Sequence, residues 1–288
     1  MSNVKIKSFF EEATCTVIYI VIDKKTKQCA IIDPVLDYLP NSGKTSTETA
    51  DLLIDFIHSN KLKTEWIIET HAHADHLSSA PYLKEKLGGK TAIGEHITQV
   101  QDIFKGVFNL EKEFLIDGSQ FDQLLIDGES ISLGDSEIQI MHTPGHTPAC
   151  VTLVIDNNAI VGDTLFMPDF GTARCDFPGG DAKSLYQSIQ KIYELPTKTK
   201  VFVGHDYQSS SRNYFAWESS IEEQKQKNIH IKSGVTEEEF VNVRQSRDKN
   251  LDVPKLILPS VQVNIRAGCM PPKENNGISY MKIPINAL

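Results

Sequence analysis

The 288 residues of this chain are 40% hydrophobic and carry a formal net charge of −9, with an isoelectric point near 5.5. A chain of this length can bury one large core or two modest ones. The acidity argues against nucleic acid as the main partner, and no apolar run is long enough to span a bilayer, so we expect neither a nucleic-acid nor a membrane partner.

The first ten residues and the cysteines predict a cytoplasmic protein without disulfides. Residues 1–10 lack the apolar core of a secretion signal and have the pattern of a first strand. The five cysteines are odd in number and show no CxxC spacing, which argues against a disulfide framework.

Strands and helices alternate over the first two hundred residues. Hydrophobic periodicity predicts strands at residues 3–9, 15–22, 28–32, 65–69, 122–126, 130–133, 137–142, 150–155, 158–162 and 200–204. It predicts helices at residues 46–60, 77–88, 95–105 and 181–193. This order favours an α/β protein built as an αββα sandwich, in which two sheets lie between layers of helices.

The chain changes character after about residue 208. Two charged helical segments lead into a tail that is rich in proline, with Pro254, Pro259, Pro271, Pro272 and Pro284. We expect a catalytic core over residues 1–208 and a C-terminal extension over residues 209–288. The extension is expected to pack on the core as a lid and to contribute to the substrate pocket.

Four potential metal ligands lie within six residues just after the strand predicted at 65–69. They are His71, His73, Asp75 and His76. Crowded imidazoles and a carboxylate at a buried strand end lose hydration, and a metal ion removes that conflict. His71 and His73 point the same way in an extended segment, and a following helical turn could present the other two as a second set. The segment could therefore serve one metal or two.

Three later strand ends carry further candidate ligands. His146 lies in a turn formed by two prolines and a glycine, Asp163 follows an apolar run, and His205 follows another. Each is a weak signal alone, because Asp and His at strand ends are more often turn or cap residues. In this order, after the first cluster, they predict one composite metal site.

The ordered set resembles the metal-site pattern of the metallo-β-lactamase superfamily, in its glyoxalase II-like section. It consists of His71, His73, Asp75, His76, His146, Asp163 and His205. The superfamily includes zinc hydrolases of thioesters, lactams and phosphoesters as well as iron enzymes that use oxygen. The resemblance therefore implies the fold but does not fix the reaction.

Two further segments narrow the resemblance to the persulfide dioxygenases. Residues 164–182 look like the signature of that family, and residues 258–268 resemble its C-terminal Asn-x-Arg element, as found in bacterial beta-lactamase-hydrolase-like members. The resemblance implies oxidation of glutathione persulfide with O2 and water to sulfite and glutathione. It also implies one Fe(II) per chain, bound by His71, His146 and Asp163.

The same resemblance assigns roles to the remaining site residues. His73, Asp75, His76 and His205 would surround the iron, orient its ligands and tune the site during catalysis. Tyr207, His230, Asn264 and Arg266 would contact glutathione, and His230 occupies a position where many relatives carry an arginine. Arg174 and Asp176 are expected to form an ion pair or hydrogen-bond hub that braces the loop behind the iron.

Two alternatives stay open from the sequence. One is a glyoxalase II-type zinc hydrolase of acyl-glutathione thioesters, in which the residues around the iron would themselves be zinc ligands. The other is a metal-binding protein of the sulfide response without turnover. A sulfurtransferase acting in trans is a hypothesis for a partner, and the sequence leaves homo-oligomer formation open.

Overall fold

The computed structural model describes residues 2–286. Within that range the elements follow in the order β1 (Val4–Glu11), β2 (Thr16–Asp23), β3 (Gln28–Ile32), β4 (Val35–Leu39), β5 (Lys44–Ser46), α1 (Glu48–Ser59), β6 (Lys63–Ile68), β7 (Leu77–Ser78), α2 (Ala80–Leu87), β8 (Lys90–Gly94), α3 (Ile97–Val107), β9 (Gln123–Leu125), β10 (Ser130–Leu133), β11 (Ser136–His142), β12 (Val151–Ile155), β13 (Asn158–Ile160), α4 (Ala182–Tyr193), β14 (Lys200–Phe202), β15 (Glu218–Ser220), α5 (Ile221–Lys227), α6 (Glu237–Asp248) and α7 (Ile257–Asn264).

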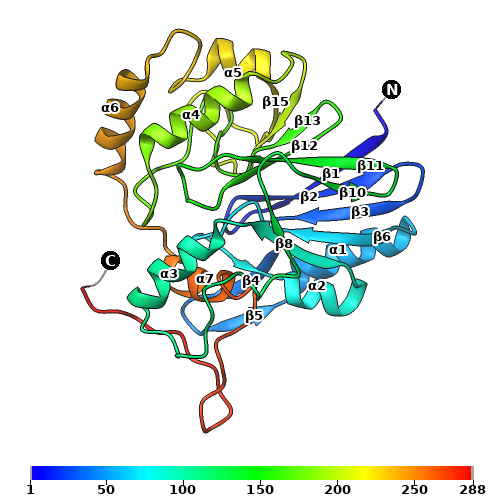
Figure 1. The fold of residues 1–288 in the computed structure, drawn as a ribbon, viewed down its shortest axis with the longest axis vertical. Helices are drawn as coiled ribbons and strands as arrows, with labels where there is room; N and C mark the ends of the chain where they lie inside the picture. The colour runs from blue at the N-terminus through cyan, green and yellow to red at the C-terminus, as the bar shows by residue number, and fades with distance from the viewer. Residues whose placement is uncertain (1, 287–288) are drawn as a thin grey trace.

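Two six-stranded sheets face each other in the middle of the molecule (Figure 1). The first has the strand order β1-β2-β3-β6-β8-β9, and the second has the order β10-β11-β12-β13-β14-β15. Helices α1 and α2 lie against the first sheet, and α4 and α5 lie on the far side of the second (Figure 1). A small sheet of β5, β4 and β7 stands apart. The predicted αββα sandwich is thus confirmed.

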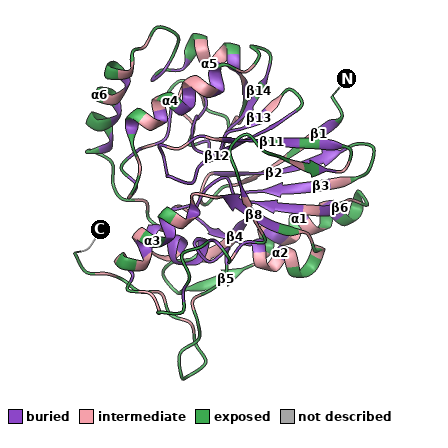
Figure 2. Ribbon diagram, in the orientation of Figure 1, coloured by how far each residue is buried: buried purple, intermediate pink, exposed green. Residues whose placement is uncertain are grey.

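Strand β2 shows how the layers are held together. Its residues Val17, Tyr19 and Val21 face the second sheet and belong to the core between the sheets. The alternate residues Ile18 and Ile20 face the other way and pack with α1 and α2. Because side chains alternate across a strand, a strand that is buried on both faces, as β2 is, serves two cores at once. Figure 2 shows the resulting concentration of buried residues along the strands, with exposed residues on the outer surfaces of the helices.

Most predicted elements are present within two or three residues of their predicted ends, but six were missed. Strands β4, β5 and β7 form the small sheet, and β8 and β15 join the large sheets. Each has five residues or fewer. The helix predicted at 77–88 begins only at Ala80, because Leu77 and Ser78 pair with β4. The sixth missed element is α7, within the tail that the prolines mark as irregular.

The segment after residue 208 is continuous with the sandwich. Strand β15 pairs with β14 as the last strand of the second sheet. Ile221 of α5 and Phe240 of α6 are fully buried in the cluster beneath α4, and Val261 of α7 packs with α3. The extension therefore contributes a strand and buried helices to the core, and its role as a lid stays a prediction.

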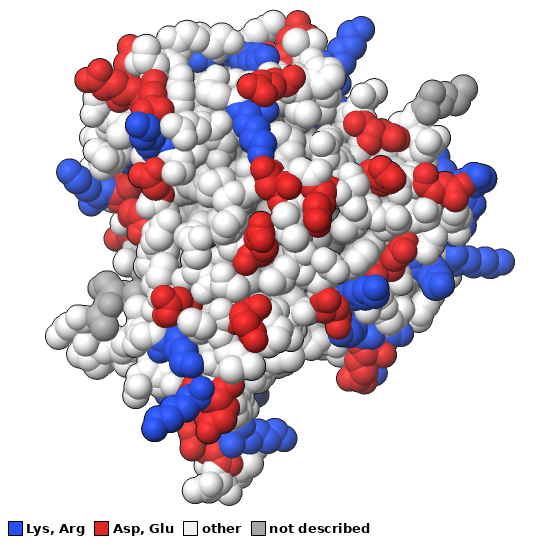
Figure 3. Space-filling model, in the orientation of Figure 1, with Lys and Arg blue, Asp and Glu red and all other residues white. Residues whose placement is uncertain are grey.

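Acidic and basic side chains are interspersed on the face drawn in Figure 3. Within residues 2–286, none of the helices has both the length and the apolar character that crossing a membrane requires.

A buried ion pair fixes α6 to the loop that follows β13. Nη2 of Arg244 donates to Oδ1 of Asp248 at 2.6 Å, and Oδ2 of Asp248 accepts from the backbone N of Cys175 at 2.9 Å. Nη1 of Arg244 donates to the carbonyl of Thr172 at 2.8 Å. Both charged residues are almost fully buried. Loss of one partner would leave an unpaired buried charge.

We expect Asp248→Ala to lower the free energy of unfolding by about 3–5 kcal/mol, because it leaves the Arg244 guanidinium buried and unpaired. Chemical denaturation measures this change. Asp252→Ala removes an exposed carboxylate four residues away and should change the stability by less than about 0.5 kcal/mol. Equal effects of the two substitutions would contradict this account of the pair.

Candidate metal centre and active-site cavity

Four loops meet at one edge of the two sheets. They follow β6, β11, β13 and β14 and carry the residues that the sequence singled out. The sheets are joined beside them, because the backbone N of Val17 donates to the carbonyl of Gly204 at 2.8 Å and Thr16 bridges to His205. The fold thus gathers candidate ligands from positions up to 134 residues apart, between His71 and His205.

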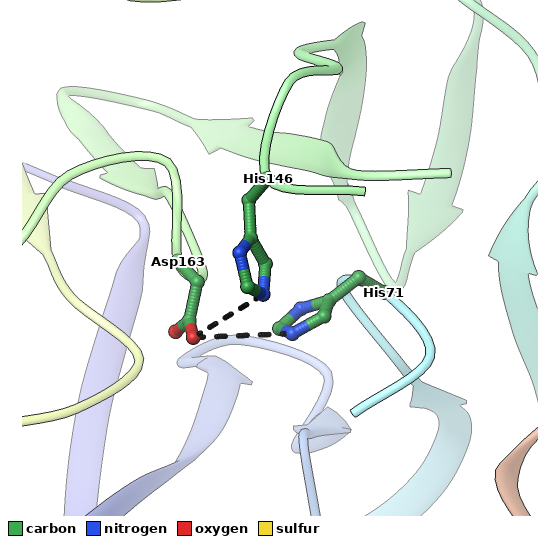
Figure 4. A group of neighbouring side chains, drawn as sticks. All are labelled: His71, His146 and Asp163. Carbon is green, nitrogen blue, oxygen red and sulfur yellow. Dashed lines mark ion pairs between the residues drawn. The ribbon is translucent and has the colours of Figure 1, made fainter. Parts of the chain in front are cut away.

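His71, His146 and Asp163 point toward one another (Figure 4). Nε2 of His71 lies 4.0 Å from Oδ2 of Asp163, and Nε2 of His146 lies 3.8 Å from the same oxygen. All three residues are buried. Ligand atoms that each lie about 2.0–2.2 Å from one metal are separated by distances of this order.

The hydrogen bonds and the burial of the His71 and His146 imidazoles favour metal binding. Nδ1 of His146 donates to the carbonyl of Arg174 at 2.8 Å, which leaves Nε2 with its lone pair free to coordinate. Nδ1 of His71 lies 3.0 Å from Oγ1 of Thr70, and Nε2 of His71 has no hydrogen-bond partner among the described residues. Burial lowers the pKa of His71 well below its ordinary value, and the nearby His73 and His146 lower it further. Neutral imidazoles and a carboxylate fit a divalent cation such as Fe(II) or Zn(II).

A turn with a glycine that cannot be replaced presents His146. Gly145 has φ +136°, and a Cβ atom there would lie 2.3 Å from Cα of Leu185. The carbonyl of Gly145 accepts from the N of Asp181, and the carbonyl of Pro144 accepts from Ser188 at 2.6 Å. The turn is therefore seated on the start of α4, which fixes the direction of His146.

A second set of possible ligands lies beside the first. Atoms of His73, Asp75 and His205 are within 4.8 Å of one another. Nε2 of His205 lies 3.4 Å from Oδ2 of Asp75 and 3.4 Å from Oδ1 of Asp163. Nδ1 of His76 lies 3.1 Å from Oδ2 of Asp75. The two sets are thus adjacent, and Asp163 faces both.

His73 is held on one side by two carboxylates that sequence reasoning missed. Its Nε2 lies 3.0 Å from Oδ1 of Asp33 and 3.3 Å from Oε2 of Glu69. Burial lowers the pKa of His73, but the charge of Asp33 and the hydrogen bonds to Asp33 and Glu69 outweigh burial and raise it well above its ordinary value. Asp33 also accepts from the N and Oγ1 of Thr70. An Asp directly after an apolar strand was the available signal, the same one that identified Asp163.

A cavity of about 710 Å³ opens onto the metal centre. Asp75, His146 and Asp163 line its inner part, and Phe166 and Phe170 contribute apolar walls. Residues of α6 and of the segment that follows α6 also line it, namely Arg244, Arg247, Leu251, Pro254, Lys255 and Leu256. Its size is ordinary for a small-molecule site.

Residues 13–205 match the family described as the metallo-beta-lactamase superfamily. The chain belongs to this superfamily. The predicted superfamily is thus confirmed. The His and Asp clusters lie within the matched region, and both the fold and these side chains support metal binding there.

Several superfamily members are similar over nearly their whole length. Glyoxylase B2 of Dictyostelium discoideum is 54% identical over 100% of this chain and 99% of its own. A probable metallo-hydrolase of Burkholderia pseudomallei is 52% identical, covering 98% of this chain and 99% of its own. Human mitochondrial persulfide dioxygenase ETHE1 is 29% identical, covering 93% of this chain and 90% of its own.

Among solved structures, ETHE1 from Myxococcus xanthus has a similar fold. Its TM-score is 0.72 at 26% sequence identity, covering 92% of this chain and all of that chain. The similarity extends beyond residue 208, which agrees with the continuity of the extension and the sandwich.

Of the residues predicted to contact substrate, only Tyr207 lines the cavity beside the metal centre. Tyr207 is 44% exposed, and its ring stacks on the His205 ring with centroids 5.6 Å apart. It also packs against Phe166 and Phe170. Tyr207 therefore lies between the metal centre and the open part of the cavity.

His230 and Asn264 are placed elsewhere, which corrects the prediction that they line the pocket. His230 is buried, and its Nδ1 accepts from the N of Thr172 at 3.1 Å. Burial, followed by the charges of Arg244 and Arg247, lowers the pKa of His230 to about 3. Asn264 donates to the carbonyls of His73 and His76, both at 2.8 Å. It supports the metal loop from behind and does not face the cavity.

Arg266 is also absent from the cavity lining. Its Nη1 and Nη2 donate to the two carboxylate oxygens of Glu111 at 2.6 and 2.9 Å, and its guanidinium lies 4.5 Å from the centre of the Phe114 ring. This bidentate pair ties the end of α7 to the loop after α3. The structure thus places Arg266 as a structural tie.

Arg174 and Asp176 form the predicted ion pair. Nη2 of Arg174 donates to Oδ2 of Asp176 at 2.6 Å, Nε donates to Oδ1, and Nη1 donates to the carbonyl of Asp252 at 2.6 Å. Since the carbonyl of Arg174 accepts from His146, this hub fixes the orientation of a metal ligand through the backbone.

We expect Arg266→Ala and Glu111→Ala to destabilise the protein and to leave ligand binding in the 710 Å³ cavity unchanged, because the pair lies outside the lining of that cavity. Denaturation of the two single variants and the double variant should give a coupling energy of about 0.5–3 kcal/mol. Isothermal calorimetry should find the affinity for glutathione unchanged in the folded variants. A selective loss of glutathione affinity in Arg266→Ala, without a stability change, would restore Arg266 as a substrate contact.

Proposed function

We propose that this protein is an iron-dependent dioxygenase that oxidises glutathione persulfide with O2 and water to sulfite and glutathione. The observation that carries the proposal is that possible ligand atoms of His71, His146 and Asp163 all lie within 4.8 Å of one another and form a set of their own. Two imidazoles and one carboxylate on one face are typical of non-haem Fe(II) oxygenases, since such a set leaves coordination positions open. His73 is outside this group, and its Nε2 is engaged by Asp33 and Glu69.

Iron bound by these three residues would supply the site at which a persulfide sulfur and dioxygen meet. The chain's own residues supply geometry around it. The bond from His146 to the carbonyl of Arg174 holds the ring in the coordinating tautomer. Phe166, Phe170 and Tyr207 form an aromatic wall beside the centre, which limits water around a reactive sulfur.

The relatives support this proposal in part. Human ETHE1, whose name is persulfide dioxygenase, covers nearly the whole chain at 29% identity, and the Myxococcus xanthus ETHE1 structure has the same fold. The proposed function and its alternative both act on a derivative of glutathione. A sulfurtransferase acting in trans would supply the persulfide, and this partner stays a hypothesis.

A zinc-dependent glutathione thioester hydrolase is the second candidate, and a specific observation favours it. His73, Asp75 and His205 form a second ligand set next to the first, as a two-metal centre requires. The more similar relatives are named glyoxylase B2 and probable metallo-hydrolase, at 54% and 52% identity. The metal and the reaction must therefore be measured together.

Protein purified without oxygen should contain close to one iron per chain at the His71, His146 and Asp163 set, because Nε2 of His73 in the second set is engaged by Asp33 and Glu69. It should consume oxygen with glutathione persulfide and produce sulfite. Elemental analysis and an oxygen electrode make these measurements. Two tightly bound zinc ions per chain with rapid hydrolysis of acyl-glutathione would establish the hydrolase instead, and metal without either activity would favour a non-catalytic role.

We expect His146→Ala to abolish iron binding, since it removes one of three ligands, and Asp75→Ala to retain most of the iron while turnover falls about 10- to 100-fold. Metal content and oxygen uptake of the two variants test this difference. His142→Ala changes a histidine on the same strand-to-turn segment that lies outside both ligand sets, and it serves as the matched control. Equal loss of metal from the His146 and Asp75 variants would contradict a mononuclear centre.

A further inference from the structure

The basic residues that line the cavity come from the loop after β13 and from the C-terminal extension. Arg174, Arg244, Arg247 and Lys255 are the basic residues that line it, and its acidic lining residues are Asp75 and Asp163 at the metal centre. A ligand in this cavity therefore meets metal-binding groups on one wall and cations from the loop after β13 and from the extension on another.

Two of these cations are already neutralised. Arg174 is paired with Asp176, and Arg244 is paired with Asp248. Arg247 and Lys255 differ, because neither forms an ion pair or a side-chain hydrogen bond with any residue in the 2–286 range, and both are exposed. They are free to bind an anionic group of a ligand.

Hydrogen bonds of neighbouring residues fix the backbone on which Arg247 and Lys255 lie. Arg247 lies in the last turn of α6, one residue before Asp248, which anchors that turn to the N of Cys175. Lys255 follows Pro254, and the preceding carbonyl of Asp252 accepts from Arg174. The same contacts that brace the metal loop thus hold the two cations at the cavity.

We propose that Arg247 and Lys255 form a carboxylate-binding subsite for a glutathione-type thiol whose sulfur faces the metal centre. This inference rests on the proposed function, since it names how that substrate is held. Glutathione carries two carboxylates, and its thiol is separated from each by several bonds, so sulfur and carboxylate can engage different walls. The apolar walls formed by Phe166, Phe170 and Leu251 suit the segment between them.

This assignment replaces the contacts expected from the sequence. Arg266 is committed to Glu111, and His230 is buried and uncharged near neutral pH because its pKa is about 3. Neither side chain lines the cavity. Among the described residues, the lining leaves Arg247 and Lys255 as the cations without an acidic partner.

The test compares glutathione with glutathione diethyl ester, which has the same thiol but no carboxylate charge. Calorimetry on the metal-loaded protein should show that the wild type binds glutathione about tenfold or more tightly than the diester. Arg247→Ala and Lys255→Ala should each weaken glutathione binding about three- to tenfold and leave diester binding unchanged. Arg247→Lys should restore part of the affinity, because it keeps the charge.

Lys249→Ala is the matched control. It removes an equal exposed charge at the end of the same helix, outside the cavity lining, and should change neither affinity. The proposal is overturned if the wild type binds acid and diester equally. It is also overturned if the Arg247 and Lys255 variants lose affinity for both ligands alike, or if Lys249→Ala has the same effect as they do.

Oxygen uptake with glutathione persulfide, measured on the same preparations, keeps the two proposals apart. If uptake is absent while the binding pattern holds, the dioxygenase proposal fails and the carboxylate subsite stands, as it would for an acyl-glutathione hydrolase. If uptake is normal but the variants bind glutathione like the wild type, the subsite fails and the dioxygenase proposal stands.

Discussion

Burial of several imidazoles and carboxylates at one edge of two facing sheets is the constraint on which the rest of the structure depends. His71, His73, His76 and His205 are each about 1% exposed, and Asp163 faces both ligand sets. Uncompensated burial of so many polar groups is costly, and coordination to a metal offsets that cost. The surrounding hydrogen bonds determine which nitrogen atoms remain free for it.

The supporting contacts come from all parts of the chain. Asp33 after β3 holds Thr70 and His73, the carbonyl of Arg174 holds His146, and Asn264 of α7 holds the metal loop by two of its carbonyls. The extension is therefore part of the metal centre's support as well as a wall of the cavity. Such outer contacts typically change metal affinity or activity by about 10- to 100-fold when they are lost.

Two adjacent ligand sets give the site its chemical ambiguity. The His71, His146 and Asp163 set suits one iron, whereas addition of the His73, Asp75 and His205 set would give a two-metal hydrolytic centre. The same residue types serve both, so the ligand residues alone do not fix the reaction. Here the carboxylates of Asp33 and Glu69, which engage one side of His73, are the most direct difference between the sets.

The sequence by itself determined the layered fold, the family and the seven residues at the metal centre, because hydrophobic periodicity and ligand spacing are local properties of the chain. It also predicted the Arg174 and Asp176 pair. Only the tertiary structure decided which polar residues face the cavity: His230, Asn264 and Arg266 turn to other partners, whereas Arg247 and Lys255, unremarkable in the sequence, line it. A side chain's role depends on the partners that distant segments bring to it, and those partners, such as Glu111 for Arg266, leave no periodic signal.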